Sequence, residues 1–261
     1  MQIEVIIEKK SHKLDAEEGK TILETLQEHG IHVLTAPCGG RGRCGKCTVE
    51  VEHMGEVLAC MTKVTDGMRI TIPKVQLRAQ KSKIAENGTV THYPADDGEG
   101  LDAACDIGTT TVVCHLIDGK TGEKLATVSE PSAQRSFGAD VLSRIQAAEA
   151  GKLEILKEQI IFQIAQMLRT LQKKTGRGEQ IQRLAVVGNT VMCHLFAGIS
   201  PVSIGVTPFM PQEFFGKEYT GEQLGLTDCR SVYIAPAVAG FVGGDTVSYT
   251  HLRAHETVLD L

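Results

Sequence analysis

The stretch APCGGRGRCGKC, residues 36–47, decides the fold of the first part of the chain, together with Cys60. Cys38, Cys44, Cys47 and Cys60 are separated by five, two and twelve residues. Three thiolates in a glycine-rich loop and a fourth further along match the ligand set of a [2Fe-2S] cluster. The glycines let the backbone wrap closely and turn its N–H groups toward the sulfurs. The sequence therefore predicts an iron–sulfur centre held by these four cysteines.

A zinc site and a pair of disulfides are the two alternatives. Cys44 and Cys47 alone have zinc spacing, but zinc sites usually join two short cysteine pairs, and Cys60 has no such neighbour. Disulfides need an oxidising compartment, and nothing in the sequence indicates one. The iron–sulfur interpretation is favoured because the four ligands and the glycine loop agree.

The segments around this loop predict a small α+β domain. Residues 2–8 alternate apolar and polar side chains, as a half-buried strand does. Thr21 and Glu24 form a capping-box pattern at the start of a helix that Gly30 ends. Further strands are expected at residues 12–14, 47–51, 56–59 and 68–72. This arrangement resembles the β-grasp ferredoxins of the plant and adrenodoxin type, and the resemblance covers residues 1–78.

Length, charge and cysteine content limit the number of domains, the classes of partner and the cellular compartment that fit this chain. A chain of 261 residues usually holds about two domains. The net charge of -5 provides no general basic field for nucleic acid or an acidic membrane, so neither partner is expected. No apolar run reaches membrane-spanning length, and eight cysteines without a secretion signal favour the reducing cytoplasm. Arg41, Arg43 and Lys46 either meet an acidic redox partner or balance the cluster's charge.

Residues 79–100 are expected to be a linker, because they are polar and end in an acidic, glycine-rich run. Such a stretch is either a flexible tether that lets the redox domain visit more than one partner or a plain domain boundary. The four remaining cysteines stand in apolar contexts and are expected to be small core residues. They are Cys105, Cys114, Cys193 and Cys229.

A second domain is predicted from residue 101 onward. Asp106, Gly108, Thr109 and Thr110 lie where one apolar strand ends and the next begins. This turn resembles the phosphate-binding hairpin of actin, sugar kinases and chaperone ATPases. Gly108 would bring the backbone close to a phosphate, the threonines would donate hydrogen bonds, and Asp106 would hold Mg²⁺ through water. The alternative is a β-hairpin with a polar turn.

The rest of the domain alternates helix and strand, which predicts an α/β class. Residues 138–148 and 153–171 have apolar side chains at helical spacing, and residues 192–196 continue as another helix. Strands are expected at 124–129, 183–188 and 231–235, with a glycine-rich turn at 240–245. Asp140, Asn189 and Asp245 lie at turns or helix starts, where capping explains them as well as catalysis does.

Read in order, the cysteine loop, DIGTTT at 106–111, FGADVLSRI at 137–145, VGNTVM at 187–192 and AGFVGGDT at 239–246 resemble the reductive activators of corrinoid-dependent enzymes. The resemblance implies a ferredoxin domain fused to an actin-like (ASKHA, ribonuclease-H-like) ATP-binding domain. It also implies the cofactors [2Fe-2S], ATP and Mg²⁺, an upstream electron donor, and a corrinoid protein or methyltransferase as partner. A nucleotide would help an uphill reduction only through differential affinity for two states.

Two departures from that family accompany the resemblance. No extra domain fits into 79–100, and a second phosphate loop and an adenosine pocket would have to follow residue 245. Residues 247–261 resemble the translation of a sequencing adapter, so 101–246 is expected to be the N-terminal part of the ATP-binding domain; a genuine C-terminal helix is the alternative. A simple electron carrier with a docking domain, and a redox-regulated kinase-like or chaperone-like protein, remain alternative functions.

Overall fold

The computed structural model describes residues 1–31, 33–73, 100–241 and 243. The chain forms two compact units. The first, called here the iron–sulfur unit, comprises Met1–Lys83 and Ala133–Ala147, and the second unit comprises Ile84–Ser132 and Ala148–Leu261. The expected linker, except for Gly100, and the expected foreign tail lie outside the described residues.

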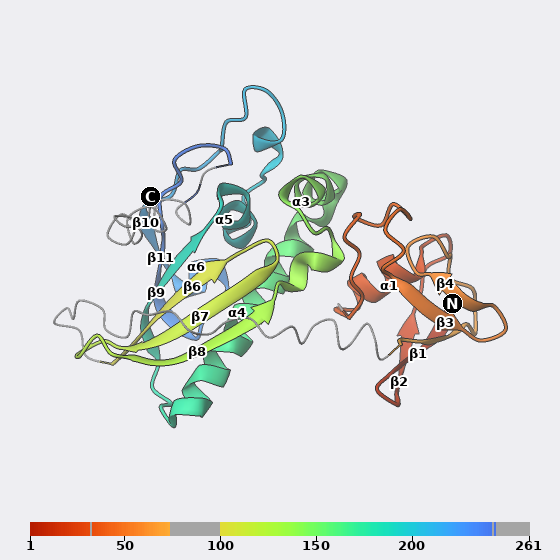
Figure 1. Ribbon diagram of the computed structural model, residues 1–261, viewed down its shortest axis with the longest axis horizontal. Coiled ribbons are helices and arrows are strands. Elements are labelled where there is room, and N and C mark those ends of the chain that lie inside the picture. Colours follow the sequence, from red (N-terminus) through yellow and green to blue (C-terminus); the bar gives the residue numbers. More distant parts are fainter. Residues whose placement is uncertain (32, 74–99, 242, 244–261) are drawn as a thin grey trace, which may run out of the picture. The chain divides into compact units, whose positions relative to one another are not determined.

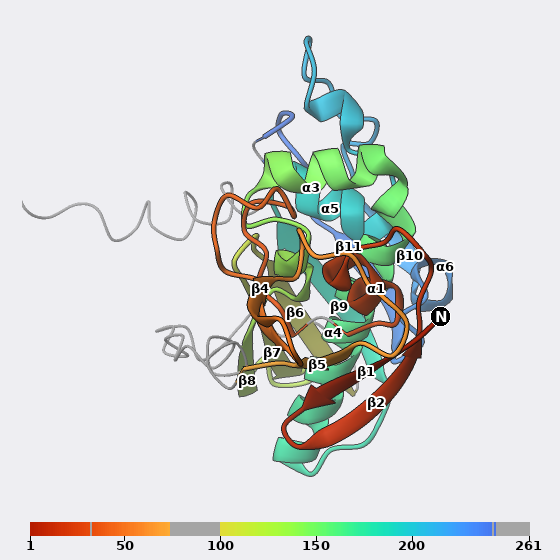
Figure 2. The ribbon, with the colours of Figure 1, turned by 90° about the vertical axis from the view of Figure 1, so that its right-hand side faces the viewer.

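The iron–sulfur unit contains a five-stranded mixed sheet in the order β2-β1-β5-β3-β4. Strand β1 pairs antiparallel with β2 and parallel with β5, while β3 pairs antiparallel with both β5 and β4. Figure 2 shows the β1–β2 hairpin lengthwise. The strands are β1 (Gln2–Ile7), β2 (Lys10–Asp15), β3 (Thr48–Val51), β4 (Gly55–Leu58) and β5 (Arg69–Thr71).

Helix α1 (Ile22–Glu28) begins as the sequence predicts. The Thr21 hydroxyl accepts a hydrogen bond from the Glu24 amide at 3.2 Å, and the Glu24 carboxylate accepts one from the Thr21 amide at 2.9 Å. This capping box satisfies two amide donors that the first helical turn leaves unpaired. The apolar face of α1 joins the buried side chains of the sheet in one core, with Ile22 and Leu26 fully buried.

A segment distant in the sequence completes this unit. It contains the 3₁₀ turn η1 (Ala133–Ser136) and helix α3 (Val141–Ala147). Helix α3 begins later than the predicted residue 138, because the Asp140 carboxylate accepts the Ser143 amide at 2.8 Å and so caps the helix start. Arg144 is fully buried and donates to the Gly138 carbonyl and to the Gln134 side chain.

The second unit is built on a six-stranded sheet in the order β10-β11-β9-β6-β7-β8 (Figure 1). Strands β6, β7 and β8 form an antiparallel meander, and β9 and β11 continue the sheet parallel to β6. The strands are β6 (Leu101–Ile107), β7 (Thr111–Asp118), β8 (Lys124–Pro131), β9 (Ile181–Gly188), β10 (Lys217–Thr220) and β11 (Cys229–Ile234). This is the α/β arrangement that the sequence predicts.

Helix α4 (Leu153–Thr175) contacts β7, β8 and helix α5 (Thr190–Ala197). It is longer than predicted and ends at Gly176, whose left-handed backbone closes the last turn. Its buried residues recur at helical spacing, with Leu156, Ile160 and Ile164 fully buried. The shorter elements are η2 (Ala148–Lys152), η3 (Val202–Ile204) and α6 (Gly221–Leu224).

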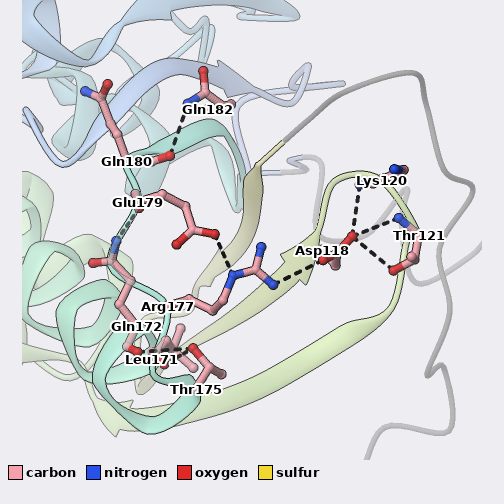
Figure 3. A network of polar contacts seen from close by, with 10 residues as sticks. All are labelled: Asp118, Lys120, Thr121, Leu171, Gln172, Thr175, Arg177, Glu179, Gln180 and Gln182. Carbon is pink, nitrogen blue, oxygen red and sulfur yellow. Dashed lines mark hydrogen bonds and ion pairs between the residues drawn. The ribbon is translucent and has the colours of Figure 1, made fainter.

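Figure 3 shows how the β7–β8 turn is tied to the end of α4. The Asp118 carboxylate accepts hydrogen bonds from the Lys120 and Thr121 amides at 3.1 and 2.9 Å, and from Arg177 at 3.2 Å. Arg177 also pairs with Glu179 at 2.5 Å. Hydrogen bonds from the Thr121 amide and Arg177 keep the pKa of Asp118 below its usual value, despite an opposing effect of burial.

Among the described residues, one strand and one α-helix were not predicted from the sequence. Other predictions are confirmed. Strand β10 and helix α6 were missed, although Thr220 and Gln223 form a capping box whose pattern is present in the sequence. The four cysteines outside the loop are all buried, as expected. Among the described helices, none is both long and apolar enough to cross a membrane.

Replacing Thr21 with Ala should loosen α1, because it removes one half of the capping box. The expected cost is about 1 kcal/mol, and amides of residues 24–28 should exchange with solvent about fivefold faster. Hydrogen exchange with mass spectrometry measures this directly. Thr65→Ala, at an exposed position outside helix α1, is the control, and equal exchange in the two variants would contradict the capping role.

Candidate functional site

The four predicted ligands, Cys38, Cys44, Cys47 and Cys60, lie as two pairs. The Cys47 and Cys60 sulfurs are 3.3 Å apart, and both side chains are buried. Cys38 and Cys44 are partly exposed, and their thiols are hydrogen-bonded to each other. The four residues that the sequence selects thus form two thiol pairs, and their role as cluster ligands stays a prediction.

The surroundings of these thiols differ in electrostatic character. Burial opposes ionisation of Cys38, but the Cys44 thiol and the backbone amides of Cys44, Arg43 and Arg41 donate to its sulfur and lower its pKa to about 6. Burial, followed by the neighbouring Cys47 thiol, raises the pKa of Cys60 to about 12. Cys38 thus already lies in a setting that stabilises a thiolate, the form in which cysteine binds metal.

Glycines make this loop conformation possible at the points of closest approach. Gly42 has φ +71°, and a Cβ placed on it would stand 2.8 Å from the Met61 sulfur. Gly40 has φ +82° and lies against Leu23 and Cys60. A larger residue at either position would have a strained backbone.

The donor set fits a two-iron cluster better than a single metal ion. Two sulfurs bound to one tetrahedral metal at about 2.3 Å would lie roughly 3.8 Å apart, close to the spacing of Cys47 and Cys60. Two thiol pairs match a [2Fe-2S] cluster, in which each iron takes two protein ligands.

The second candidate site is the turn between β6 and β7. The Gly108 amide donates to the Thr111 carbonyl at 2.9 Å, and a Cβ on Gly108 would stand 2.5 Å from the same oxygen. Only glycine is therefore compatible with this turn. Asp106, near the end of β6, and Thr110 are exposed, and Gly108 and Thr109 are partly buried. The four predicted residues are therefore neighbours at the end of β6 and in the turn that follows it.

Two further glycines meet the end of β6. Gly188, the last residue of β9, pairs with Ile107, and a Cβ on Gly188 would stand 2.9 Å from the Ile107 carbonyl oxygen. Gly243 lies so close to Gly188 and Asn189 that it has no room for a Cβ. Both glycines belong to sequence motifs, at 187–192 and 239–246, but the sequence alone assigned no role to them. The signal that could have identified Gly188 is a glycine at the end of a predicted strand.

This edge of the sheet has the features of a phosphate site. Ligands in α/β sheets bind beyond the carboxyl ends of parallel strands, where backbone approaches closely, and β6 and β9 both end here. Exposed backbone N–H groups in tight turns attract anions. Residues 106–110 therefore lie at the edge where α/β sheets bind their ligands, and phosphate binding there stays a prediction.

Helix capping accounts for two of the three polar residues, Asp140, Asn189 and Asp245, that the sequence places at turns or helix starts. Asn189 accepts from the Met192 amide at 3.0 Å and caps α5, as Asp140 caps α3. Asp245 lies outside the described residues.

Comparisons with known proteins agree with this arrangement. Residues 4–74 match the family model described as "2Fe-2S iron-sulfur cluster binding domain", and residues 101–254 match "RACo middle region". A match to an iron–sulfur cluster binding domain is thus followed by a match to the RACo middle region. Since the second match covers more than half of the chain, the chain belongs to the RACo middle region family.

Two relatives are informative. "Corrinoid activation enzyme RamQ" from Eubacterium limosum is 26% identical over 82% of this chain and 50% of its own length. A solved structure named "Reductive activator for corrinoid,iron-sulfur protein" is 23% identical, with a TM-score of 0.57, and matches 98% of this chain and 58% of its own. The chain thus spans about half the length of these relatives, and the structural likeness shows a shared fold.

Replacing Gly188 with Ala should destabilise the second unit, because the new methyl group would press on the Ile107 carbonyl. Overpacking of this kind costs about 1–3 kcal/mol, which corresponds to a Tm lower by roughly 3–10 °C. Tyrosine emission during heating measures it, since the iron–sulfur unit contains neither Tyr nor Trp. Gly178→Ala, where a Cβ meets nothing within 4 Å, should leave Tm unchanged or slightly higher; equal losses would refute the argument.

Proposed function

We propose that this protein transfers electrons through a [2Fe-2S] cluster to a Co(II) corrinoid protein or corrinoid-dependent methyltransferase, and that nucleotide binding assists the transfer. The observation that carries the proposal is the pairing of four thiols, three from the cysteine loop and one from Cys60, within a chain of the RACo middle region family. The relative named for corrinoid activation supports the choice of partner.

In this proposal Cys38 and Cys44 hold one iron, and Cys47 and Cys60 hold the other. The cluster, when bound, supplies one-electron transfer. The chain's own contribution is the set of backbone amides of Arg41, Arg43 and Cys44 directed at the Cys38 sulfur. Such N–H groups stabilise negative charge on a ligand sulfur and help to set the reduction potential.

The same proposal places the phosphates of Mg-ATP at the turn between β6 and β7. Gly108, Thr109 and Thr110 would contact the phosphates, and Asp106 would hold Mg²⁺ through water. The close approach of Gly188 and Gly243 to the strand ends supports it, because it leaves backbone without bulky side chains at this edge. Nucleotide would aid the reduction by binding one state of the activator–target complex more tightly than the other.

The remaining parts of the proposal follow from the chemistry. A low-potential donor must reduce the cluster before each electron passes to cobalt. Free thiols that bind iron are kept reduced in the cytoplasm, which is the proposed location. A simple [2Fe-2S] carrier is the competing function, and nucleotide dependence separates the two.

Replacing Cys47 with Ser should lower the iron content and abolish corrinoid reduction, because a buried ligand is lost. Iron per chain and visible absorbance report the cluster, and the spectral change of Co(II) to Co(I) reports the reaction. Cys229→Ala removes a buried thiol outside the loop and should retain both. Full iron content in the Cys47 variant would overturn the ligand assignment. Reduction that proceeds equally without Mg-ATP would favour the simple carrier.

A further inference from the structure

Positive charge gathers on the cysteine loop of the iron–sulfur unit. Residues 29–49 contain no Asp or Glu, but they contain three cationic side chains, which are Arg41, Arg43 and Lys46. All three are exposed, and together they are called here the basic face. In the part of the chain that the structure describes, Arg41 and Arg43 form no ion pair with a carboxylate. Both arginines therefore present their charge to solvent.

The basic face lies beside the Cys38 sulfur. The backbone amides of Arg41 and Arg43 donate to this sulfur, so both side chains start from backbone that touches it. The Arg41 guanidinium donates to the Gln146 side chain of α3, which is uncharged and leaves the positive charge in place. Cys38 and Cys44 are the partly exposed pair among the four thiols. A molecule bound to the arginines would therefore lie next to the half of the thiol set that is not buried.

The exposure of these side chains favours contact with a partner over charge balance inside the unit. Charges that face water interact weakly, because the solvent and its salt screen them. The Cys38 sulfur already accepts hydrogen bonds from three backbone amides, which lie closer to it than any exposed guanidinium could stay at low cost. Exposed cations instead act on a charged surface that approaches from solvent. Since the chain as a whole carries a net charge of -5, the basic face orients an acidic partner toward this one loop.

An exposed methionine adds an apolar contact at the same place. Met61 is largely exposed, and its thioether lies against Gly42, which stands between the two arginines in the sequence. Arg and Met are enriched in protein–protein interfaces, and the flexible thioether adapts to the shape of its partner. Cations around a small apolar centre are thus the features of a protein docking surface.

Nucleic acid is the other polyanion that a basic surface could bind. Single strands are held by aromatic side chains on which the bases stack, in addition to cations. Phe137 is the one Phe, Tyr or Trp of the iron–sulfur unit, and it is buried. The basic face therefore fits an acidic protein better than a nucleic acid.

We propose that the basic face and Met61 form the docking surface for an acidic patch on the protein that accepts the electron of the cluster. That the partner accepts electrons rests on the proposed function, whereas its acidic chemistry rests on the residues of this surface. Docking here places the partner beside the Cys38 sulfur. Because exposed charges drive it, salt weakens the association.

Binding of an acidic polypeptide to the whole chain tests the charge of this surface. The probe is fluorescein-labelled poly-L-glutamate, and its anisotropy gives Kd at low salt and at about 0.15 M ionic strength. The double variant Arg41→Glu, Arg43→Glu keeps both backbone amides but reverses both charges, so Kd at low salt should rise roughly 10- to 100-fold.

A matched variant controls for net charge. Lys9→Glu, Lys10→Glu makes the same change at two exposed residues beside the β1–β2 turn, and β2 lies at the sheet edge opposite β4. Its Kd should rise less than about threefold, because these charges are further from the loop than a Debye length allows to act strongly. An equal rise in the two variants, or no rise in either, would overturn the proposal. So would tighter binding of a single-stranded oligothymidylate than of poly-L-glutamate, since the surface would then be one for nucleic acid.

Chemical labelling locates the bound polypeptide on the chain. p-Hydroxyphenylglyoxal modifies exposed guanidinium groups, and mass spectrometry measures the rate at each arginine. With poly-L-glutamate at about ten times Kd, modification of Arg41 and Arg43 should slow about tenfold, because only the unbound fraction reacts. Arg230, which is exposed in the second unit, should react at its normal rate. Protection of Arg230 without protection of the loop would contradict the assignment of the surface.

The result is separable from the proposed function. Both measurements use the whole chain as purified and need no iron, and iron content is determined apart from them. A chain that lacks iron but binds poly-L-glutamate through the two arginines would refute electron transfer and leave the acidic docking surface standing. In the iron-loaded chain, transfer to a Co(II) corrinoid protein should slow about tenfold or more in the Arg41 and Arg43 double variant. Equal transfer rates in that variant and the parent chain would overturn the assignment of the partner.

Discussion

The crowding of backbone amides around the Cys38 sulfur is the constraint on which the iron–sulfur unit depends. Three amides from Arg41, Arg43 and Cys44 can reach one sulfur only if the chain turns back on itself within six residues. Gly40 and Gly42, both at positive φ, make that turn sterically possible. Leu23 of α1 and Cys60 both lie in contact range of Gly40 and support the loop there.

The second unit depends on a similar close approach of backbone, at the ends of two parallel strands. Gly188 lies against the Ile107 carbonyl, and Gly108 lies against that of Thr111. In each case a side chain would separate segments that must touch. Both units therefore use glycine where two segments approach too closely for a side chain to fit between them.

Local patterns in the sequence predicted much of this fold, because they act over a few residues. The Thr21 and Glu24 pattern predicted the start of α1, and the repeat of Leu156, Ile160 and Ile164 predicted α4. The cysteine spacing selected four thiols as ligands, and two of them, Cys47 and Cys60, lie 3.3 Å apart. Helix α6 was missed although Thr220 and Gln223 show the same local signal, because only one turn of helix follows it.

The long-range contacts could not be predicted from the sequence. Nothing in residues 133–147 indicates that they pack on α1 and the cysteine loop, since Gln27 and Ser136 are ordinary polar residues whose pairing depends on tertiary geometry. The roles of Gly188 and Gly243 likewise appear only when strand register places them side by side. Asn189 and Asp140 could be interpreted as caps or as catalytic groups until the amides of Met192 and Ser143 were located.

The contact between Gly42 and Met61 has a consequence for chemical damage. Met61 is 61% exposed, yet its thioether lies against Gly42 in the loop that carries Cys38, Cys44 and Cys47. Redox centres that meet oxygen generate oxidants, and a thioether is converted by them to a polar sulfoxide. The added oxygen would occupy space that the loop backbone already borders. Oxidation of Met61 in air is therefore expected to disturb the packing of this loop, in addition to any damage at the proposed iron site.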